Sequence, residues 1–336
     1  MPEQYLKAEP TSDSPPYAQN PKDGIMRFTH RPSIRTRMFQ WLTGKMVRVN
    51  KIKEHNCRKA RQALETWANR QKLPPSVKTM SGTLDGFSYM WVIPPGCSEH
   101  KILYYLHGGG YSLCSANTHK RLIAALAGYA GMKALAINYR LAPEFRFPTA
   151  VTDAIKGYEF LLQSGFNAQH IVFAGDSAGG GLALSVLFSL KERKIPMPAA
   201  AVLISPWTDL TGSGQSLFAN KKTDPLLTPE AVKLWGAIYA GPQVKHPLAS
   251  PIYGDFSGLP PLCIQVSDSE ILLDDALRAY QCARDAAVPC TLEIWHGLMH
   301  VWQIHTFLPE ARKALQRLAA FIHSTLRLVM QQQTFA

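Results

Sequence analysis

Apolar residues along this chain recur with two different periods, which separates helical from extended segments. From about residue 27 to residue 71 the apolar positions recur at helical spacing, and Pro74-Pro75 ends this stretch. Two β-type runs follow at residues 77–80 and 87–93, on either side of the hairpin-favouring dipeptide Asp85-Gly86. The pattern therefore predicts helices first and then a β-hairpin.

The remainder of the chain alternates between short apolar strands and helix-like stretches. The expected strands cover residues 102–106, 134–139, 171–174, 201–204, 262–266 and 291–295. The helix-like stretches cover residues 119–130, 150–162 and 182–191, and a last apolar stripe runs over residues 315–329. This order predicts an α/β protein with a mostly parallel central sheet, helices on both faces and an antiparallel start. Ligands of such sheets bind beyond the carboxyl ends of the strands.

One interval, residues 207–261, contains no expected strand and only one helical run, near residues 229–239. Together with the N-terminal helices it is expected to form a helical cap over the strand ends. We therefore expect three parts, which are a flexible proline-rich tail (residues 1–21) with cap helices in residues 1–75, a catalytic unit in residues 76–206 and 262–336, and an inserted cap segment in residues 207–261.

Composition agrees with a globular enzyme, since 46% of the 336 residues are hydrophobic and 18% are charged. No apolar run approaches the roughly 18 residues of a membrane span. The N-terminus lacks the pattern of a secretory signal, so a cytoplasmic location is expected. Six cysteines without a C-x-x-C pair predict neither a zinc site nor a disulfide framework.

The net charge of +12 is concentrated near the N-terminus. Residues 22–61 contain twelve Lys or Arg against two acidic residues, a local charge of 12 − 2 = +10. Such a segment can be a solvated helical face or can bind an anionic membrane surface. Nucleic-acid binding is not expected because no recognition motif accompanies the charge. Peripheral membrane contact through residues 22–61 and a homodimer are kept as hypotheses.

The motif Gly175-Asp176-Ser177-Ala178-Gly179 lies between an expected strand and an expected helix. This is the G-x-S-x-G pattern in the strand–turn–helix context that a nucleophile elbow requires. The tight turn exposes the serine hydroxyl, and the following helix directs its positive end towards it. Ser177 is therefore the expected nucleophile.

Upstream, His107-Gly108-Gly109-Gly110 directly follows the strand expected at residues 102–106. Consecutive glycines allow backbone N–H groups to face a developing oxyanion. We expect the N–H groups of Gly108, Gly109 and Ala178 to be the oxyanion donors, and His107 to organise the loop.

A serine nucleophile needs a base and an orienting carboxylate, in the chain order Ser, acid, His. The loop after the last expected strand contains His296 and His300, and either could be the base. After the strand at residues 262–266, Asp268 and Glu270 remain as acid candidates. Asp274 and Asp275 open a helix, where capping and dipole roles suit them.

The combination resembles the bacterial hormone-sensitive-lipase family of esterases, which has the H-G-G-G and G-D-S-A-G motifs in this order. The resemblance extends from about residue 101 to residue 300 and includes Tyr139-Arg140-Leu141-Ala142-Pro143-Glu144. It implies Glu270 as the acid, at a position where aspartate is common in the family, and His300 as the base. It also implies short-to-medium acyl esters as substrates and a helical lid.

These observations predict a serine carboxylesterase that acts on a small-molecule ester and needs no metal or organic cofactor. The alternatives are an amidase, peptidase or lactone hydrolase with the same site, or a non-catalytic ligand-binding protein on the same fold. Four aromatic residues are candidates either for the pocket or for packing of the lid, namely Trp41, Trp207, Phe218 and Trp235.

Overall fold

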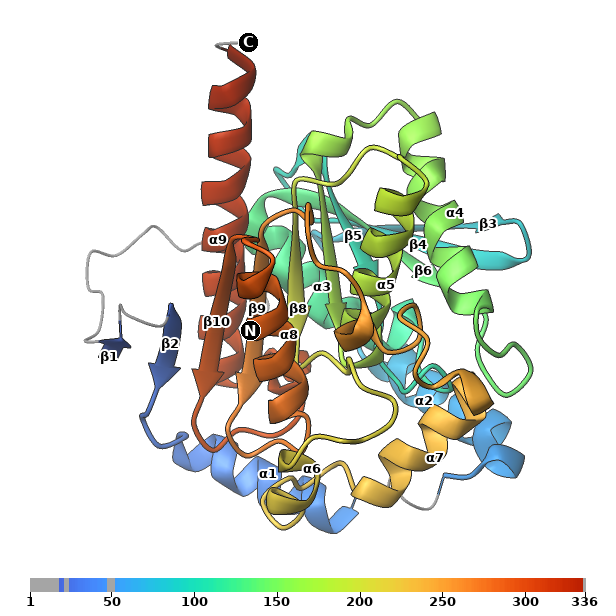
Figure 1. Cartoon of the computed structure of the whole chain (residues 1–336), viewed down its shortest axis with the longest axis vertical. Coiled ribbons are helices and arrows are strands. Elements are labelled where there is room, and N and C mark those ends of the chain that lie inside the picture. Colours follow the sequence, from blue (N-terminus) through green and yellow to red (C-terminus); the bar gives the residue numbers. More distant parts are fainter. Residues whose placement is uncertain (1–17, 21–23, 47–51, 335–336) are drawn as a thin grey trace.

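The computed structural model describes residues 18–20, 24–46 and 52–334 (Figure 1). In these residues one sheet has the strand order β1-β2-β10-β9-β8-β7-β5-β6-β4-β3. The strands are β1 (Ala18–Asn20), β2 (Ile25–Phe28), β3 (Lys78–Leu84), β4 (Phe87–Ile93), β5 (Ser98–Leu106), β6 (Met132–Asn138), β7 (Ile171–Asp176), β8 (Ala200–Ile204), β9 (Leu262–Ser267) and β10 (Cys290–Trp295). The helices are α1 (Ile34–Met46), α2 (Cys57–Arg70), α3 (Ala116–Ala130), α4 (Thr149–Gln163), α5 (Ala178–Glu192), α6 (Ser216–Ala219), α7 (Pro229–Ala240), α8 (Leu273–Asp285) and α9 (Pro309–Thr334).

Seven neighbouring strands, from β2 through β10, β9, β8, β7 and β5 to β6, run parallel. The β3–β4 hairpin continues the sheet in the antiparallel direction beyond β6. Its turn residues Asp85 and Gly86 have φ angles of 43° and 89°, the positive values that a two-residue hairpin turn favours. The predicted α/β class, the parallel centre and the antiparallel start are confirmed.

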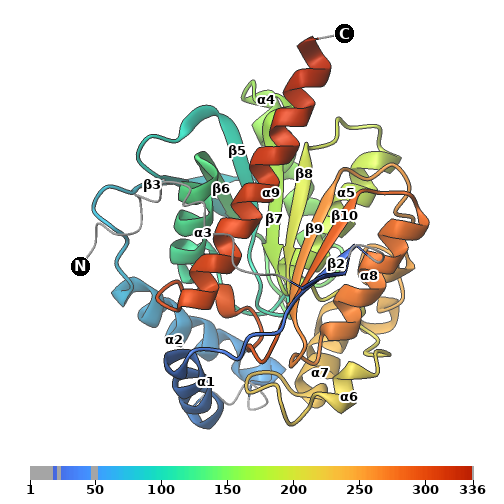
Figure 2. The same ribbon diagram turned by 90° about the vertical axis from the view of Figure 1, so that its left-hand side faces the viewer.

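Each face of the sheet buries alternate residues of the same strand, because successive side chains point to opposite sides. On β5, Ile102 and Tyr104 pack into one cluster, with residues of α4, α5 and α8. Leu103 and Tyr105 pack into the other cluster, with residues of α3 and α9. Figure 2 shows α9 and α3 crossing the second face.

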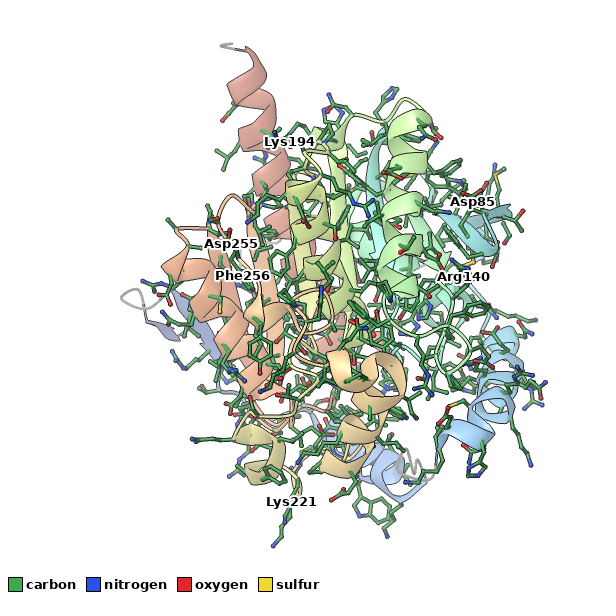
Figure 3. The ribbon with its side chains drawn as sticks, turned by 45° about the vertical axis from the view of Figure 1, so that its right-hand side comes forward. Asp85, Arg140, Lys194, Lys221, Asp255 and Phe256 are labelled. Carbon is green, nitrogen blue, oxygen red and sulfur yellow. The ribbon has the colours of Figure 1, made fainter. Side chains whose placement is uncertain are left out.

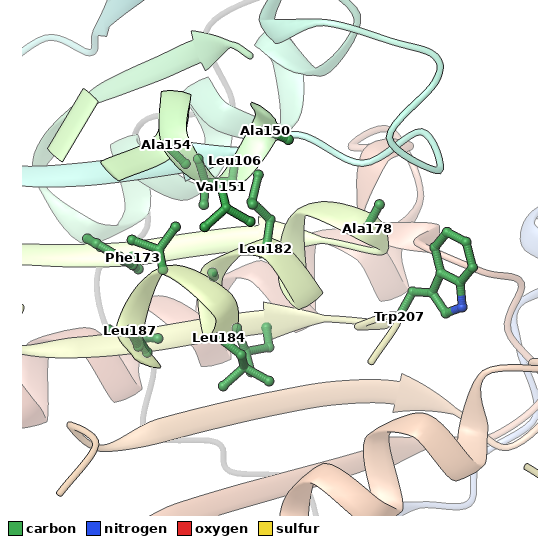
Figure 4. Packing of buried hydrophobic residues seen from close by; sticks show 14 of the residues in the cluster. Leu106, Ala150, Val151, Ala154, Phe173, Ala178, Leu182, Leu184, Leu187 and Trp207 are labelled. Carbon is green, nitrogen blue, oxygen red and sulfur yellow. The ribbon is translucent and has the colours of Figure 1, made fainter. Parts of the chain in front are cut away.

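Helix α5 is buried along nearly its whole length, which fixes the residue that precedes it. Figure 4 shows Leu182, Leu184 and Leu187 of α5 among the buried side chains of one cluster, which also contains Phe173 of β7 and Val151 of α4. Full burial of one such side chain contributes about 1.5–3 kcal/mol. The N-terminus of α5 is therefore held firmly against the carboxyl end of β7.

The first part of the chain differs from the expectation in one respect. We expected a helical pattern from about residue 27, but Ile25–Phe28 form strand β2, which pairs in parallel with β10. Phe28 stacks on Trp295 with ring centroids 4.2 Å apart. A four-residue edge strand is too short to show an alternating pattern of its own, and Phe28 also fits the helical spacing of the residues that follow.

The tail expected at residues 1–21 lies outside the described residues apart from β1. Those three residues pair antiparallel with β2. Figures 1 and 2 show α1, α2, α6 and α7 together at the carboxyl end of the parallel strands. Helices α1, α2 and α7 occupy the positions where helical runs were expected, whereas the division of the chain into three parts stays a prediction. Among the helices that the structure describes, none is long and apolar enough to cross a membrane.

Candidate active site

Ser177 occupies the sharp turn between β7 and α5. Its backbone angles, φ 52° and ψ −120°, are ones that an L-residue rarely adopts. A Cβ atom on Gly175 would lie 2.3 Å from the carbonyl oxygen of Gly179, and one on Gly179 would lie 2.0 Å from that of Leu106. Both glycines of the motif are therefore required by close backbone approach, and the turn holds the serine side chain away from the sheet.

Ser177, His300 and Glu270 form one hydrogen-bonded chain. The Ser177 hydroxyl lies 2.9 Å from His300 Nε2, and His300 Nδ1 lies 2.7 Å from Glu270 Oε2. Because a carboxylate can only accept here, His300 carries its proton on Nδ1 and leaves Nε2 free to accept from the hydroxyl. The three predicted residues, which are 30 to 123 positions apart in sequence, meet at the carboxyl ends of β7, β9 and β10.

Glu270 is completely buried, and both of its carboxylate oxygens have hydrogen-bond partners. Its Oε1 accepts the Ser205 hydroxyl at 2.8 Å and the Ser267 backbone N–H at 2.9 Å. Burial raises the pKa of Glu270 above its ordinary value, and the hydrogen bond to His300 opposes that rise. Burial alone would lower the pKa of His300, but the hydrogen bond and the charge of Glu270 outweigh it and raise that pKa above 6.5. The carboxylate therefore stabilises the charged imidazolium.

The second candidates for acid and base form a separate pair with each other. Asp268 Oδ2 lies 2.6 Å from His296 Nδ1, and Asp268 Oδ1 accepts the Gly297 N–H at 2.8 Å. The two side chains are 38% and 49% exposed, whereas those of Glu270 and His300 are 0% and 5% exposed. The structure thus brings Glu270 and His300 to Ser177 and leaves Asp268 and His296 paired at the surface.

The loop His107-Gly108-Gly109-Gly110 lies beside the elbow, and its first glycine differs from the expectation. The Gly108 N–H donates to Asp176 Oδ1 at 3.0 Å, so this N–H already has a buried acceptor and is not free for an oxyanion. For the N–H groups of Gly109, Gly110 and Ala178 the structure gives no acceptor among the described residues. The prediction that Gly108 is a donor is therefore wrong, and Gly110 takes its place as a candidate.

Asp176 connects the elbow to this loop and was not singled out from the sequence. Besides the Gly108 N–H, its carboxylate accepts the Tyr105 hydroxyl at 2.7 Å and lies 3.2 Å from His119 Nε2. All of these groups are buried. Burial alone would lower the pKa of His119, but Asp176 raises it above its ordinary value. The only sequence signal for Asp176 is its place beside the nucleophile, and His119 has none.

His107 organises the loop, as expected. Burial and the nearby His119 lower the pKa of His107 to about 3, so its ring is neutral. The ring stacks on Tyr139 at a centroid distance of 4.3 Å, and the His107 carbonyl accepts the Tyr139 hydroxyl at 2.7 Å. His107 therefore fixes the glycine loop through packing and hydrogen bonds.

Backbone strain concentrates around this site. Within the described residues, eight residues other than glycine have positive φ angles, and five of them lie at Ser177 or on the segments around it. These five are Tyr111, Cys114, Ser177, Ser205 and Val301. For the β-branched Val301, which follows the histidine, a φ of 51° is especially unfavourable. Such strain persists only where the surrounding structure enforces it, and it is typical of functional sites.

The four candidate aromatic residues divide into two buried and two exposed side chains. Trp207 is 2% exposed; its backbone N–H donates to the Ser177 carbonyl at 2.9 Å, and its indole N–H donates to the Asp209 carbonyl at 3.2 Å. Trp235 is 5% exposed and lies against Gly110, where a Cβ would meet its ring at 2.7 Å. Trp41 and Phe218 are 58% and 52% exposed. The first two therefore border the reactive groups, and the other two lie on the outside of the cap helices.

The described residues contain no cluster of three His, Cys, Asp or Glu side chains arranged to hold a metal ion. The six cysteines are all free thiols. The polar groups that converge on Ser177 are instead a histidine, a carboxylate and backbone N–H groups, a set that suits acyl transfer.

A parallel sheet with a strand–serine–helix turn at its carboxyl edge defines the α/β-hydrolase fold. A family model described as alpha/beta hydrolase fold matches residues 103–304. An acetyl-hydrolase of Streptomyces hygroscopicus is 44% identical over 236 residues, which cover 70% of this chain and 79% of the relative. An esterase of Acinetobacter venetianus is 36% identical over 230 residues, 68% of this chain and 76% of the relative.

The solved structures that resemble this chain include esterases as well. An esterase/lipase from an uncultured bacterium superposes with a TM-score of 0.83 at 36% identity, covering 88% of this chain and 99% of the other. An esterase from the bacterial hormone-sensitive lipase family gives a TM-score of 0.83 at 35% identity, covering 88% and 100%. The chain belongs to the α/β-hydrolase family and, within it, to the bacterial hormone-sensitive-lipase type, and it is a carboxylic ester hydrolase.

Proposed function

We propose that this protein is a serine esterase that hydrolyses short-to-medium acyl esters through an acyl-enzyme on Ser177. The observation that carries the proposal is the hydrogen-bonded chain from Ser177 through His300 to Glu270. A hydroxyl within 2.9 Å of a neutral imidazole nitrogen has the geometry for general-base activation.

In the acylation step, His300 Nε2 takes the proton of the Ser177 hydroxyl while Oγ bonds to the ester carbonyl carbon. The carbonyl π electrons move to oxygen and give a tetrahedral oxyanion. When this intermediate collapses, the bond to the alkoxy oxygen breaks and His300 Nε2 returns the proton to the departing oxygen. An alcohol leaves and the acyl group stays on Ser177.

In the deacylation step, His300 takes a proton from water, whose oxygen attacks the acyl carbonyl. Collapse of the second intermediate breaks the bond to Oγ, returns the proton to Ser177 and releases the carboxylic acid. Glu270 keeps the imidazole oriented and stabilises its charged form in both steps. Gly109, Gly110 and Ala178 supply the oxyanion donors, each worth on the order of 3 kcal/mol in the barrier.

The size of the acyl group is inferred from the kind of protein this chain resembles. One relative is named an acetyl-hydrolase, which supports activity on the shortest acyl group. The bulky ring of Trp235, which lies against Gly110 of the glycine loop, also favours small groups. We therefore propose an optimum between two and eight acyl carbons.

A p-nitrophenyl ester series from two to twelve acyl carbons tests this proposal, with Ser177→Ala as the control. The expected result is hydrolysis that is fastest below about eight carbons and absent in the variant. Matched p-nitroanilides and a simple lactone test the amidase and lactone-hydrolase alternatives. Faster turnover of either than of the ester would overturn the ester assignment, and binding of esters without any turnover would favour a ligand-binding protein.

A homodimer, a cytoplasmic location and the division into catalytic unit and cap stay predictions. So does contact with membranes through the basic segment 22–61. None of them is needed for the chemistry above.

A further inference from the structure

Helix α1 has an inner face that is firmly attached to the rest of the protein. The Thr36 hydroxyl is buried and donates to Glu310 at the start of α9. The Gln40 side chain donates to the Gly297 carbonyl at 3.0 Å, and Phe39 packs edge-on against Phe307. The helix is therefore a rigid part of the molecule, and one of its contacts lies on the loop that carries His300.

The opposite face of α1 exposes an apolar stripe. Ile34, Met38, Trp41 and Leu42 are 82%, 60%, 58% and 42% exposed. Their spacing of i, i+4, i+7 and i+8 places all four on one side of the helix. Single exposed apolar residues need no explanation, but four large ones on one helical face define an interaction surface.

Positive charge surrounds this stripe. Arg35, Arg37 and Lys45 are exposed on α1, which has no acidic residue. Exposed Lys221 and Lys222 follow α6, and Figure 3 shows Lys221 projecting outwards at the end of the molecule where the cap helices lie. Exposed apolar side chains beside basic ones, on a helix without an acidic residue, suit contact with an anionic membrane surface.

We propose that the outward face of α1 docks this protein on an anionic lipid surface, with Ile34, Met38, Trp41 and Leu42 entering the headgroup region. The clustered positive charge favours this occupant over a second copy of the chain, because a symmetric pairing would bring the same cations together. Anionic headgroups neutralise them instead.

Docking through α1 would turn the carboxyl end of the sheet, with Ser177, towards the lipid. In this respect the inference rests on the proposed function, since it makes esters held at a lipid surface the accessible substrates. The binding itself does not depend on catalysis and can be measured in Ser177→Ala.

The experiment is co-sedimentation of the full chain with vesicles of phosphatidylcholine containing 30 mol% phosphatidylglycerol, and with pure phosphatidylcholine vesicles. We expect binding to the anionic vesicles that weakens with added salt. The double variant Ile34→Gln/Met38→Gln keeps good helix formers and should bind about tenfold more weakly. Met80→Gln, which changes a 62% exposed methionine on β3, is the matched control and should bind as wild type does.

A second readout locates the contact. Lipids brominated on the acyl chains should quench part of the tryptophan fluorescence, and Trp41→Phe should remove that part. Hydrolysis of a soluble p-nitrophenyl ester is measured in every variant and should be unchanged in Ile34→Gln/Met38→Gln. If soluble-ester activity fails in the wild type, the proposed function is wrong while docking is still tested by sedimentation.

Three results would overturn the docking proposal. They are no binding of wild type to anionic vesicles, equal binding by the double variant and Met80→Gln, and self-association in sedimentation equilibrium that the double variant abolishes. The last result would identify the face as an interface between copies of this chain.

Discussion

The backbone N–H of Gly108 donates to the carboxylate of Asp176 at 3.0 Å, which ties the glycine loop to the residue immediately before the nucleophile. A Cβ on Gly108 would lie 2.2 Å from the same carboxylate, so no other residue can approach as closely. Because of this bond, the first N–H of the loop is already used inside the protein. It also fixes the distance between the loop and Ser177.

Asp176→Asn is expected to lower kcat for soluble esters by about ten- to hundredfold, because a charge-assisted hydrogen bond to the loop is worth about 1.5–3 kcal/mol. KM should change little, since the loop donors act mainly in the transition state. Asp153→Asn is the matched control, because Asp153 is equally buried and bound by Arg140. A loss of kcat in the control as large as that in Asp176→Asn would show that any buried carboxylate has this effect.

Glu270→Gln is expected to lower kcat on the order of 10³- to 10⁴-fold, because the amide no longer selects the Nδ1–H tautomer or stabilises the imidazolium. Asp268→Asn breaks an exposed pair and should change kcat less than about fivefold. Steady-state kinetics on a p-nitrophenyl ester separate the two carboxylates. The opposite ranking would assign the acid to Asp268.

The pH profile should report the raised pKa of His300. The base must be neutral, so kcat/KM rises with pH as His300 loses its proton, and the midpoint of this rise should lie above 6.5. In Glu270→Gln the group that raises this pKa is gone, and the midpoint of the residual activity should shift to lower pH. A midpoint that stays in place in the variant would mean that Glu270 does not act on the titrating group.

Gly179→Ala is expected to lower the free energy of unfolding by more than about 4 kcal/mol, or to prevent folding, because the new Cβ would meet the Leu106 carbonyl. Gly131→Ala is the control. Gly131 has a φ of 62° but nothing within 4 Å of the added Cβ, so only the left-handed backbone should cost about 1–2 kcal/mol. Urea denaturation of both variants measures the difference, and equal losses would contradict the steric argument.

Much of this fold could be predicted because apolar residues recur at clear strand or helix spacing in most of its elements. The strands at residues 102–106 and 171–174 lie inside β5 and β7, and the run near residues 229–239 is α7. Strand β2 could not be predicted, since it owes its conformation to pairing with β10, a partner more than 260 residues away. Edge strands of this length have no local signal.

At the site, the sequence predicted the groups that react but not the groups that hold them. Ser177, Glu270 and His300 occur in recognisable motifs, whereas Ser205 and Asn220 do not. Ser205 donates to Glu270, and Asn220 of the 207–261 segment donates to the carbonyls of Asp268 and Glu270 at 2.8 Å. Likewise, a histidine followed by three glycines indicates that oxyanion donors are near, but it does not show which N–H is already bonded within the protein.

Asp274 and Asp275 also have hydrogen-bond partners that the sequence does not reveal. Their place in the first turn of α8 suggested capping, but both bind the 207–261 segment instead. Asp275 Oδ1 accepts the Thr208 N–H at 2.8 Å, and Asp274 Oδ2 accepts the Ser216 N–H at 2.9 Å. Such long-range contacts depend on the folded chain and have no counterpart in local spacing.

The most direct test of the central claim is covalent labelling with a fluorophosphonate, followed by peptide mass spectrometry. Ser177 Oγ should displace fluoride at phosphorus, so we expect one label per chain on the peptide that contains Ser177, in step with the loss of esterase activity. Ser177→Ala should take up no label. A label on another residue, or full esterase activity in Ser177→Ala, would contradict the assignment of Ser177 as the nucleophile.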